Sequence, residues 1–208
     1  MDKDVKFSED VKEYWYNQLA KIDVDASLQR RVNRCYDQFL SLNSITVPKS
    51  LLDIGCGLGL VDVFFARAGT KEIHLMDGDG SIPMDPEYSD ECRAWNDVRV
   101  AADIVKANSP EDTKVFPHFE DPNLDIKVDM IISFKSWGTH YPVSKYADLA
   151  KRCLNPGGFV VLDLRKGERW EPVGDLQLVR HISNRRVVLK VASEELSLKL
   201  RRNTPVRR

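Results

Sequence analysis

The fold is decided by the stretch Leu51-Leu52-Asp53-Ile54-Gly55-Cys56-Gly57-Leu58-Gly59. Its first four residues form a short, mainly apolar run of the kind typical of a buried strand. Three glycines at alternate positions follow, and residues 60–68 then predict a helix that Gly69 closes. Glycines let a backbone turn sharply and approach a ligand closely, and free N–H groups at a helix start can bind an anionic group. The stretch therefore predicts a ligand-binding turn between a strand and a helix.

A second acidic residue indicates what kind of ligand this turn binds. The run Glu72–Met76 predicts the next strand, and Asp77 ends it. A carboxylate at that place can accept hydrogen bonds from both hydroxyls of a ribose, and its charge excludes a 2′-phosphate. We therefore expect Asp77 to bind a ribose. The alternative is a glycine turn that only connects a strand to a helix, which three glycines between two acids disfavour.

Strands and helices alternate along the middle of the chain. Helices are expected at 9–22, 25–42, 60–68, 96–108 and 143–154, and strands at 51–54, 72–76, 114–116, 128–134 and 159–164. Two β-rich runs, 176–182 and 186–191, predict an antiparallel hairpin. This order predicts an α/β protein with a three-layer α/β/α arrangement, a mostly parallel seven-stranded sheet and a C-terminal antiparallel hairpin.

The expected organisation is a single domain with two short appendages. Residues 1–47 form a helical lead-in, 48–192 form the main domain, and 193–208 form a basic tail. We expect the two helices of the lead-in to lie over the ligand edge of the sheet as a lid, with Trp15 and Tyr16 facing the second substrate.

The glycine spacing distinguishes two classes of nucleotide-binding protein. A dinucleotide fingerprint needs its third glycine at the position of Leu60, which disfavours a nicotinamide oxidoreductase. The observed order, an acid followed by three alternate glycines, resembles motif I of class I methyltransferases that use S-adenosylmethionine, and Asp77 matches their motif II acid. The resemblance covers residues 48–191. It implies a Rossmann-like fold and S-adenosylmethionine as the cofactor.

The resemblance also implies which residues hold the cofactor. The turn residues Gly55, Cys56, Gly57 and Gly59 would lie at its methionine end, with Asp53 near the amino group. Asp77 would hold the ribose, and Gly78 and Asp79 would lie beside the adenosine.

The resemblance implies that the loop after the third strand, residues 117–123, completes the adenine pocket. Phe119 would stack on the purine and Asp121 would accept from its exocyclic amine; ordinary loop packing and a turn cap are the alternatives for these two residues. Asn96 either reaches the site or caps its own helix.

The segment from Ser133 to Pro142 follows the strongest central strand, at the sheet edge where ligands bind in α/β folds. His140 has a pKa suited to removing a proton from an alcohol, and Trp137 and Tyr141 can line an acceptor pocket. Lys135 is a further candidate for substrate binding. A structural loop histidine and a solvated lysine are the alternatives. The order SWGTHYP is similar to small bacterial and phage methyltransferases, some of them sugar O-methyltransferases, which implies methyl transfer to an oxygen of a small polar acceptor.

Composition and missing motifs exclude other functions. The net charge is −1, and no apolar run approaches the roughly 18 residues that span a bilayer. The acidic start is unlike a signal peptide, so we expect a cytoplasmic protein with reduced thiols and no membrane partner. The four cysteines lack metal-finger spacing, and no acid or histidine cluster predicts a metal. The strand end at 133–136 lacks the (D/N)PP motif of amino-methylating enzymes.

Two rival functions stay open. One is an RNA methyltransferase. Its contacts to phosphates would come from Arg30, Arg31 and Arg34 on one helix and from four arginines in the tail. The other rival is a module that binds S-adenosylmethionine without catalysis, because a fold alone does not prove turnover. The sequence does not indicate the oligomeric state.

Overall fold

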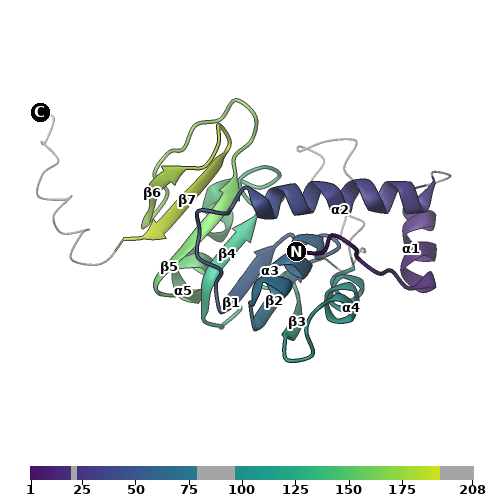
Figure 1. Cartoon of the computed structure of the whole chain (residues 1–208). Coiled ribbons are helices and arrows are strands. Elements are labelled where there is room, and N and C mark those ends of the chain that lie inside the picture. Colours follow the sequence, from purple (N-terminus) through teal and green to yellow (C-terminus); the bar gives the residue numbers. More distant parts are fainter. Residues whose placement is uncertain (20–22, 79–96, 193–208) are drawn as a thin grey trace, which may run out of the picture.

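A seven-stranded sheet forms the centre of the molecule, in the order β3-β2-β1-β4-β5-β7-β6 (Figure 1). The computed structural model describes residues 1–19, 23–78 and 97–192. The strands are β1 Ser50–Ile54, β2 Glu72–Asp77, β3 Lys114–Phe119, β4 Val128–Ser133, β5 Leu154–Asp163, β6 Leu176–His181 and β7 Arg186–Val191. Strands β1 to β5 are parallel, whereas β7 runs antiparallel to β5 and to β6. The predicted α/β fold with an antiparallel C-terminal pair is confirmed.

Helices cover the two faces of this sheet unequally. They are α1 Glu9–Leu19, α2 Val24–Leu40, α3 Leu60–Ala68, α4 Val98–Asn108, the 3-10 helix η1 Val143–Tyr146, and α5 Ala147–Cys153. The first four contribute to the apolar clusters on one face, where Leu75 and Ile132 are among the sheet residues. On the other face, η1 and α5 pack against β4, β5 and β7. Residues 120–127, which join β3 to β4, form no helix, so the second face is thinner.

Two strand boundaries differ from those expected by more than one residue. Strand β3 continues through Pro117 to Phe119, because it lies at the sheet edge, where a missing N–H costs no ladder hydrogen bond. Strand β5 begins at Leu154, since Asn155–Gly158 forms an irregularity between the pairs Val128–Leu154 and Met130–Phe159. The loop after β3 is therefore shorter than predicted, and Phe119 belongs to the strand.

The N-terminal helices are held to the domain by Trp15. Its ring is fully buried in the cluster that includes α2, α3 and α4, and its Nε1 lies 3.4 Å from the Ser27 hydroxyl oxygen. The Arg31 guanidinium lies over the ring, 4.5 Å from its centroid. The expectation that Trp15 faces a substrate is therefore wrong, because its large apolar surface is needed to dock α1 and α2. Tyr16 is half exposed.

Three simple observations complete the description. Within the described residues, no helix is long and apolar enough to cross a lipid bilayer. The described cysteines Cys35, Cys56 and Cys153 are free thiols. Among those same residues, no three His, Cys, Asp or Glu side chains are grouped to hold a metal ion.

Candidate cofactor and acceptor site

The glycine turn is tied to the end of the neighbouring strand β2. The N–H of Gly55 donates to the carbonyl of Met76 at 2.7 Å, and the N–H of Gly57 donates to Asp77 Oδ2 at 2.7 Å. Asp77 Oδ1 accepts from the N–H of Gly78 at 2.8 Å. Asp77 thus stands at the carboxyl end of β2, directly beside the turn, as the sequence predicted. Its side chain is half-buried.

Two of the three turn glycines are required by close packing. Gly55 has φ +73°, and a Cβ there would lie 2.1 Å from the Cβ of Ser136 in the loop after β4. Gly59 has φ +65° and caps α3, and its Cβ would lie 2.7 Å from a methyl carbon of Val105 in α4. The first contact places the loop after β4 directly against the glycine turn.

Two buried carboxyls lie behind the turn. Asp53 ends β1 with 3% exposure, and Asp62 in the first turn of α3 is fully buried. Burial raises the pKa of Asp62 to about 7, and burial together with the neighbouring Asp62 raises that of Asp53. Neither oxygen of Asp62 has a hydrogen-bond partner among the described residues. The sequence analysis named Asp53 but missed Asp62, because an acid in the first turn of a helix usually serves only the helix dipole.

The adenosine side of the predicted site lies at β3 and the start of α4. Phe119 is 51% exposed, pairs with Asp77 in the sheet register, and lies 5.8 Å from the guanidinium carbon of Arg99. An exposed ring next to Asp77 suits purine stacking, which stays a prediction. Asp121 Oδ1 accepts from the N–H of Asn123 at 2.8 Å, which is the turn-cap alternative.

The head of α4 differs from the sequence prediction. Asp97 is the N-cap of α4, and its carboxylate accepts from the N–H of Arg99 at 2.9 Å. The two other residues predicted for this side, Asp79 and Asn96, lie outside the described residues. On α1, Tyr14 is hydrogen-bonded to the backbone of Asp97, and the charge of nearby Asp77 contributes to raising the pKa of Tyr14. The lead-in therefore does reach the predicted cofactor edge, through Tyr14.

A polar cluster that the sequence did not reveal joins the loop after β3 to η1. The Tyr146 hydroxyl donates to Glu120 Oε1 at 2.6 Å, and Lys145 Nζ lies 2.7 Å from the same oxygen. Lys145 also lies 3.5 Å from the ring centroid of Tyr141. Burial and the Glu120 carboxylate raise the pKa of Tyr146, so its hydroxyl keeps its proton. This cluster connects the predicted acceptor residue Tyr141, through Lys145, to Glu120 in the loop after β3.

The loop after β4 is built on Ser133 and Trp137. The Ser133 hydroxyl donates to the carbonyl of Ile54 at 2.7 Å and accepts from the N–H of Trp137 at 2.9 Å. Trp137 is fully buried, and its Nε1 donates to the carbonyl of Val143 at 2.7 Å. Its predicted role in lining an acceptor pocket is corrected: the apolar ring anchors the loop in the core because that position faces α5 and η1.

His140 lies in the tight turn that this anchor creates. Its N–H donates to the carbonyl of Ser136 at 2.7 Å, and its side chain is half-buried. Burial lowers the pKa of His140, and the positive charges of Lys135 and Arg165 lower it further. The imidazole is therefore neutral at neutral pH and able to accept a proton. Lys135 is exposed and lies close enough to Cys35 of α2 to lower the pKa of that thiol, against the larger effect of burial.

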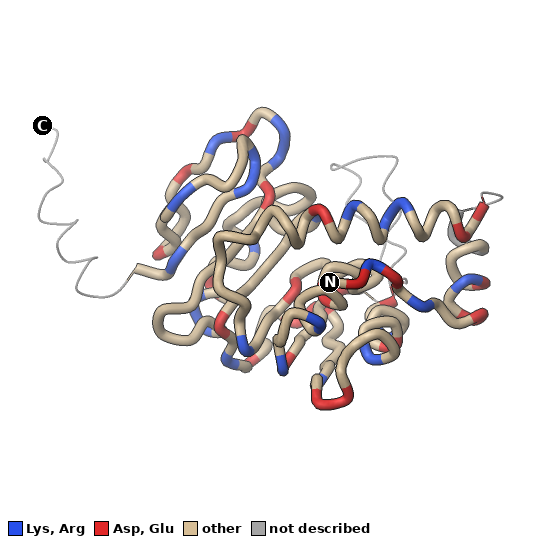
Figure 2. The backbone as a smooth tube through the Cα atoms, viewed as in Figure 1, with Lys and Arg blue, Asp and Glu red and all other residues tan. Residues whose placement is uncertain are grey.

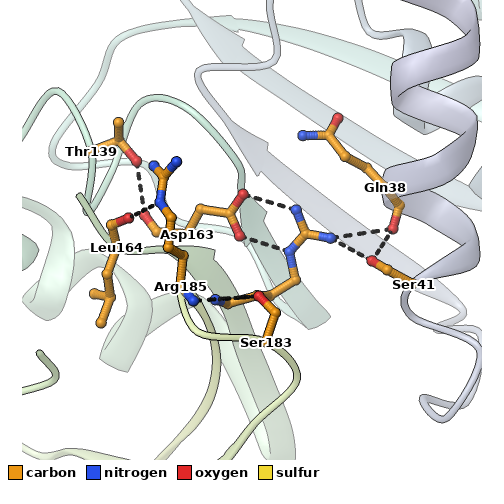
Figure 3. A network of polar contacts seen from close by, with 8 residues as sticks. Gln38, Ser41, Thr139, Asp163, Leu164, Ser183 and Arg185 are labelled. Atoms are coloured by element: carbon orange, nitrogen blue, oxygen red, sulfur yellow. Dashed lines mark hydrogen bonds and ion pairs between the residues drawn. The ribbon is translucent and has the colours of Figure 1, made fainter. Parts of the chain in front are cut away.

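An ion pair between β7 and the end of β5 lies beside this turn, and a hydrogen bond ties it to the C-cap of α2. The Arg186 guanidinium donates to the Asp163 carboxylate at 2.7 and 2.8 Å and also donates to the Ser41 hydroxyl (Figure 3). The Thr139 hydroxyl donates to the carbonyl of Asp163 at 2.9 Å, which attaches the His140 turn to β5. An open pocket of about 610 Å³ adjoins this network. Its lining residues are Ser41, Asp163, Ile182, Ser183, Asn184, Arg185 and Arg186.

Comparisons with known proteins agree with this geometry. The family described as "Methyltransferase domain" matches residues 24–191. "Probable protein arginine N-methyltransferase 6" of Arabidopsis thaliana is 29% identical over 124 residues, which are 57% of this chain and 25% of that protein. "Probable protein arginine N-methyltransferase 6.1" of Oryza sativa subsp. indica is 36% identical over 87 residues, 41% of this chain and 19% of that protein. The chain thus spans a quarter or less of the length of these relatives.

A solved structure supports the fold. A methyltransferase from Geobacter sulfurreducens superposes with a TM-score of 0.51 at 17% identity, covering 88% of this chain and 96% of that one. The residues at the turn also fit S-adenosylmethionine chemically: Asp77 offers acceptors for a ribose, and the buried oxygens of Asp62, which lack a partner among the described residues, suit a cation. The chain belongs to the methyltransferase-domain family, whose cofactor is S-adenosylmethionine.

Proposed function

We propose that this protein transfers a methyl group to an oxygen of a small polar, sugar-like acceptor, with His140 as the general base. The observation that carries the proposal is the position of a half-buried, neutral histidine in the loop that packs against the glycine turn. When bound, S-adenosylmethionine supplies an electrophilic methyl group on a sulfonium sulfur. A hydroxyl acceptor gains nucleophilicity from a nearby base, whereas an amine gains less.

The chain's own residues support the geometry of such a transfer. Ser136 contacts Gly55, and the carbonyl of Ser136 holds the His140 backbone, so only one short turn separates the base from the glycine loop. The buried Trp137 and the hydrogen bond from Thr139 to Asp163 hold this turn on two sides. A base held in this way meets the need for aligned reacting groups without later reorganisation.

The charges around His140 support the proton transfer. Lys135 and Arg165 lower the pKa of His140, so the imidazole is neutral before the reaction and releases its acquired proton readily afterwards. The open pocket at the end of β5 offers hydroxyl, amide and guanidinium groups from Ser183, Asn184 and Arg185. Such groups suit an acceptor with several hydroxyls, and Tyr141 and Lys135 complete the proposed acceptor side.

Protein arginine methylation is the second candidate, because the named plant relatives carry that description. An arginine acceptor is a cation and needs carboxylates to hold its guanidinium. The groups that act on His140 are instead the cations Lys135 and Arg165. This charge distribution favours a neutral or anionic acceptor over an arginine side chain.

RNA methylation receives less support from the described surface. The guanidinium of Arg31 packs over the Trp15 ring, and burial lowers the pKa of Arg31. Arg31 is therefore partly engaged in packing within the protein. Figure 2 shows positive and negative residues interspersed along the described chain. The basic tail, 193–208, lies outside the described residues. A long phosphate backbone is gripped best by a continuous basic stripe.

The test is transfer of radiolabelled methyl from S-adenosylmethionine to a panel of monosaccharides, sugar phosphates, an arginine-rich peptide and RNA. We expect a polyhydroxy acceptor to be labelled, and His140→Gln to lower kcat by about 10²–10⁴-fold with little change in cofactor affinity. His181→Gln, at an exposed histidine of β6, is the matched control. Labelling of the peptide or RNA alone, or unchanged kcat in His140→Gln, would overturn the proposal.

A further inference from the structure

The tip of the β6–β7 hairpin and the end of β5 enclose the open pocket that lies next to the His140 turn. The pocket measures about 610 Å³. Its wall includes the end of β5, the C-cap of α2 and the hairpin residues Ser183, Asn184 and Arg185. The hydrogen bonds and charges of these groups indicate which class of ligand the pocket can hold.

The acid in this pocket is already neutralised. Both oxygens of Asp163 accept from Arg186, Oδ1 from Nε at 2.7 Å and Oδ2 from Nη2 at 2.8 Å. The same guanidinium donates to the Ser41 hydroxyl and lies over the ring of Phe134, 4.2 Å from its centroid. Arg186 is only 8% exposed, so packing fixes this arrangement. The charge that remains for a ligand in the pocket is therefore that of Arg185.

Arg185 is held in place and keeps unused donors. Its Nε donates to the Leu164 carbonyl at 2.8 Å (Figure 3), and its own carbonyl accepts from the Leu164 N–H at 2.8 Å. Its side chain is exposed, and its terminal nitrogens Nη1 and Nη2 donate to no group in the part of the chain that the structure describes. A guanidinium fixed through Nε presents the rest of its planar fork of donors, and such a fork matches a carboxylate or a phosphate.

The neighbouring turn residues add further donors. The Ser183 hydroxyl oxygen accepts from the N–H groups of Arg185 at 3.4 Å and Arg186 at 3.0 Å, so its own hydrogen is left to donate. The Asn184 side chain is exposed and makes no hydrogen bond with another described residue. The side chains of the hairpin tip thus offer more unused donors than acceptors, and they carry a positive charge. Such a set favours an anion over a cation.

Two hydrogen bonds connect the end of β5 to the turn that carries His140. The Thr139 hydroxyl donates to the carbonyl of Asp163 at 2.9 Å, and the N–H of Arg165 donates to the carbonyl of Gly138 at 2.8 Å. The end of β5 therefore contacts the hairpin tip on one side and the His140 turn on the other. The pocket and the proposed base adjoin, as an acceptor with both an anionic group and a hydroxyl requires.

We propose that this pocket is an anion subsite, in which Arg185 and the turn residues beside it hold a phosphate or carboxylate group of the methyl acceptor while a hydroxyl of the same molecule reaches His140. The group that binds the anion is then separate from the group that activates the reacting oxygen. The two cations that act on His140 favour the same anionic acceptor. This inference rests on the proposed function, because it specifies the acceptor of that reaction.

The first test measures anion binding to the full chain without catalysis. Inorganic phosphate is titrated into isotope-labelled protein, and the backbone amide resonances of residues 183–186 are followed. We expect these resonances to shift and saturate in wild type, and the shifts to be lost in Arg185→Gln. Arg169→Gln removes an equal charge at an exposed arginine outside the pocket and should leave the shifts unchanged. Thermal unfolding of Arg185→Gln shows that this variant is folded.

The second test compares neutral sugars, sugar phosphates and uronic acids as acceptors of labelled methyl. A preference for sugar phosphates would identify a phosphate as the bound anion, and a preference for uronic acids would identify a carboxylate. We expect Arg185→Gln to raise KM for the preferred acceptor by about 10–100-fold with little change in kcat, because a charged hydrogen bond away from the reacting oxygen is lost. Arg185→Lys keeps the charge without the planar fork and should restore part of the affinity.

The outcomes distinguish this inference from the proposed function. If the phosphate shifts persist in Arg185→Gln, the anion subsite is wrong and the proposed function stands. Neutral sugars as the better acceptors, with KM unchanged in Arg185→Gln, would also overturn the subsite. If phosphate binds at the hairpin tip but no sugar of any charge is methylated, the proposed function is wrong and the anion subsite stands.

Discussion

The glycine turn and the loop after β4 lie in contact, yet they are specified in opposite ways. The turn is specified by backbone: Gly55 and Gly59 have positive φ and leave no room for a Cβ. The loop is specified by side chains: Ser133 and Trp137 hold it through hydrogen bonds and burial. Only glycine satisfies the first kind of requirement, so it is visible as a spacing in the sequence. The second kind depends on which side chains the fold buries, and the sequence alone does not indicate that.

The largest expected effect tests whether the turn is fixed by backbone. Gly55→Ala places a Cβ 2.1 Å from the Cβ of Ser136 at φ +73°. We expect it to lower the free energy of unfolding by about 3–5 kcal/mol and to abolish cofactor binding, as measured by urea unfolding and calorimetry.

The control for Gly55→Ala is Gly167→Ala. Gly167 has φ +89°, but nothing lies within 4 Å of an added Cβ, so only the backbone strain of about 1–2 kcal/mol applies. In Gly55→Ala, the second change Ser136→Gly should restore part of the stability. Equal losses in the two alanine variants would show that the contact with Ser136 does not matter.

The next effect tests the acid pair in the cofactor-free protein. The ordinary pKa of an aspartate is 3.8, and that of Asp62 in the folded protein is about 7. The folded protein therefore binds more protons than the unfolded chain between these values, and its stability falls as pH rises through them.

Asp62→Asn removes the contribution of Asp62 to this pH dependence, whereas Asp53 stays buried and keeps its own. Between pH 4 and pH 8, its free energy of unfolding should rise relative to that of wild type by on the order of 2–4 kcal/mol. Urea unfolding at several pH values measures the difference. A constant difference across this range would mean that the pKa of Asp62 is not raised in the folded protein.

A smaller effect separates two residues of the same loop. Trp137→Phe removes the donor to the Val143 carbonyl, so we expect a loss of about 1–3 kcal/mol of stability. Lys135→Ala, at an exposed position, should change stability by less than about 0.5 kcal/mol.

In catalysis the order is reversed: Lys135→Ala should change the pH–rate profile, whereas Trp137→Phe should not. Removing the Lys135 charge should raise the pKa of His140, so the acid limb of the pH–rate profile moves to higher pH. Trp137→Phe should leave that limb in place. A shift of the limb in Trp137→Phe but not in Lys135→Ala would reverse our assignment of the two residues.

These contrasts explain what the sequence predicted. Apolar periodicity and glycine spacing predicted three features correctly: the element order, the parallel sheet and the placement of Asp77 beside the turn. Trp137 and Trp15 were assigned to a substrate, since an aromatic residue in a conspicuous segment looks the same whether it faces a ligand or the core.

The residues that were missed depend on tertiary contact. Asp62 appears as an ordinary first-turn acid, and Glu120 appears as a solvated loop acid, until the fold places Asp53 and Tyr146 beside them. A buried carboxyl is recognised by the absence of water and donors around it, which no local pattern encodes. Tyr14 was missed for the same reason, because its neighbour Asp97 is distant in sequence.

The most direct test of the account is calorimetric titration of S-adenosylmethionine, and of NAD, into wild type, Asp77→Asn and the control Asp129→Asn. Asp77→Asn keeps one acceptor oxygen for the turn but loses the second acceptor that a ribose needs. We predict that wild type and Asp129→Asn bind S-adenosylmethionine equally and do not bind NAD, and that Asp77→Asn binds S-adenosylmethionine about 10–100-fold more weakly. Equal affinity in Asp77→Asn, or binding of NAD in place of S-adenosylmethionine, would contradict the account.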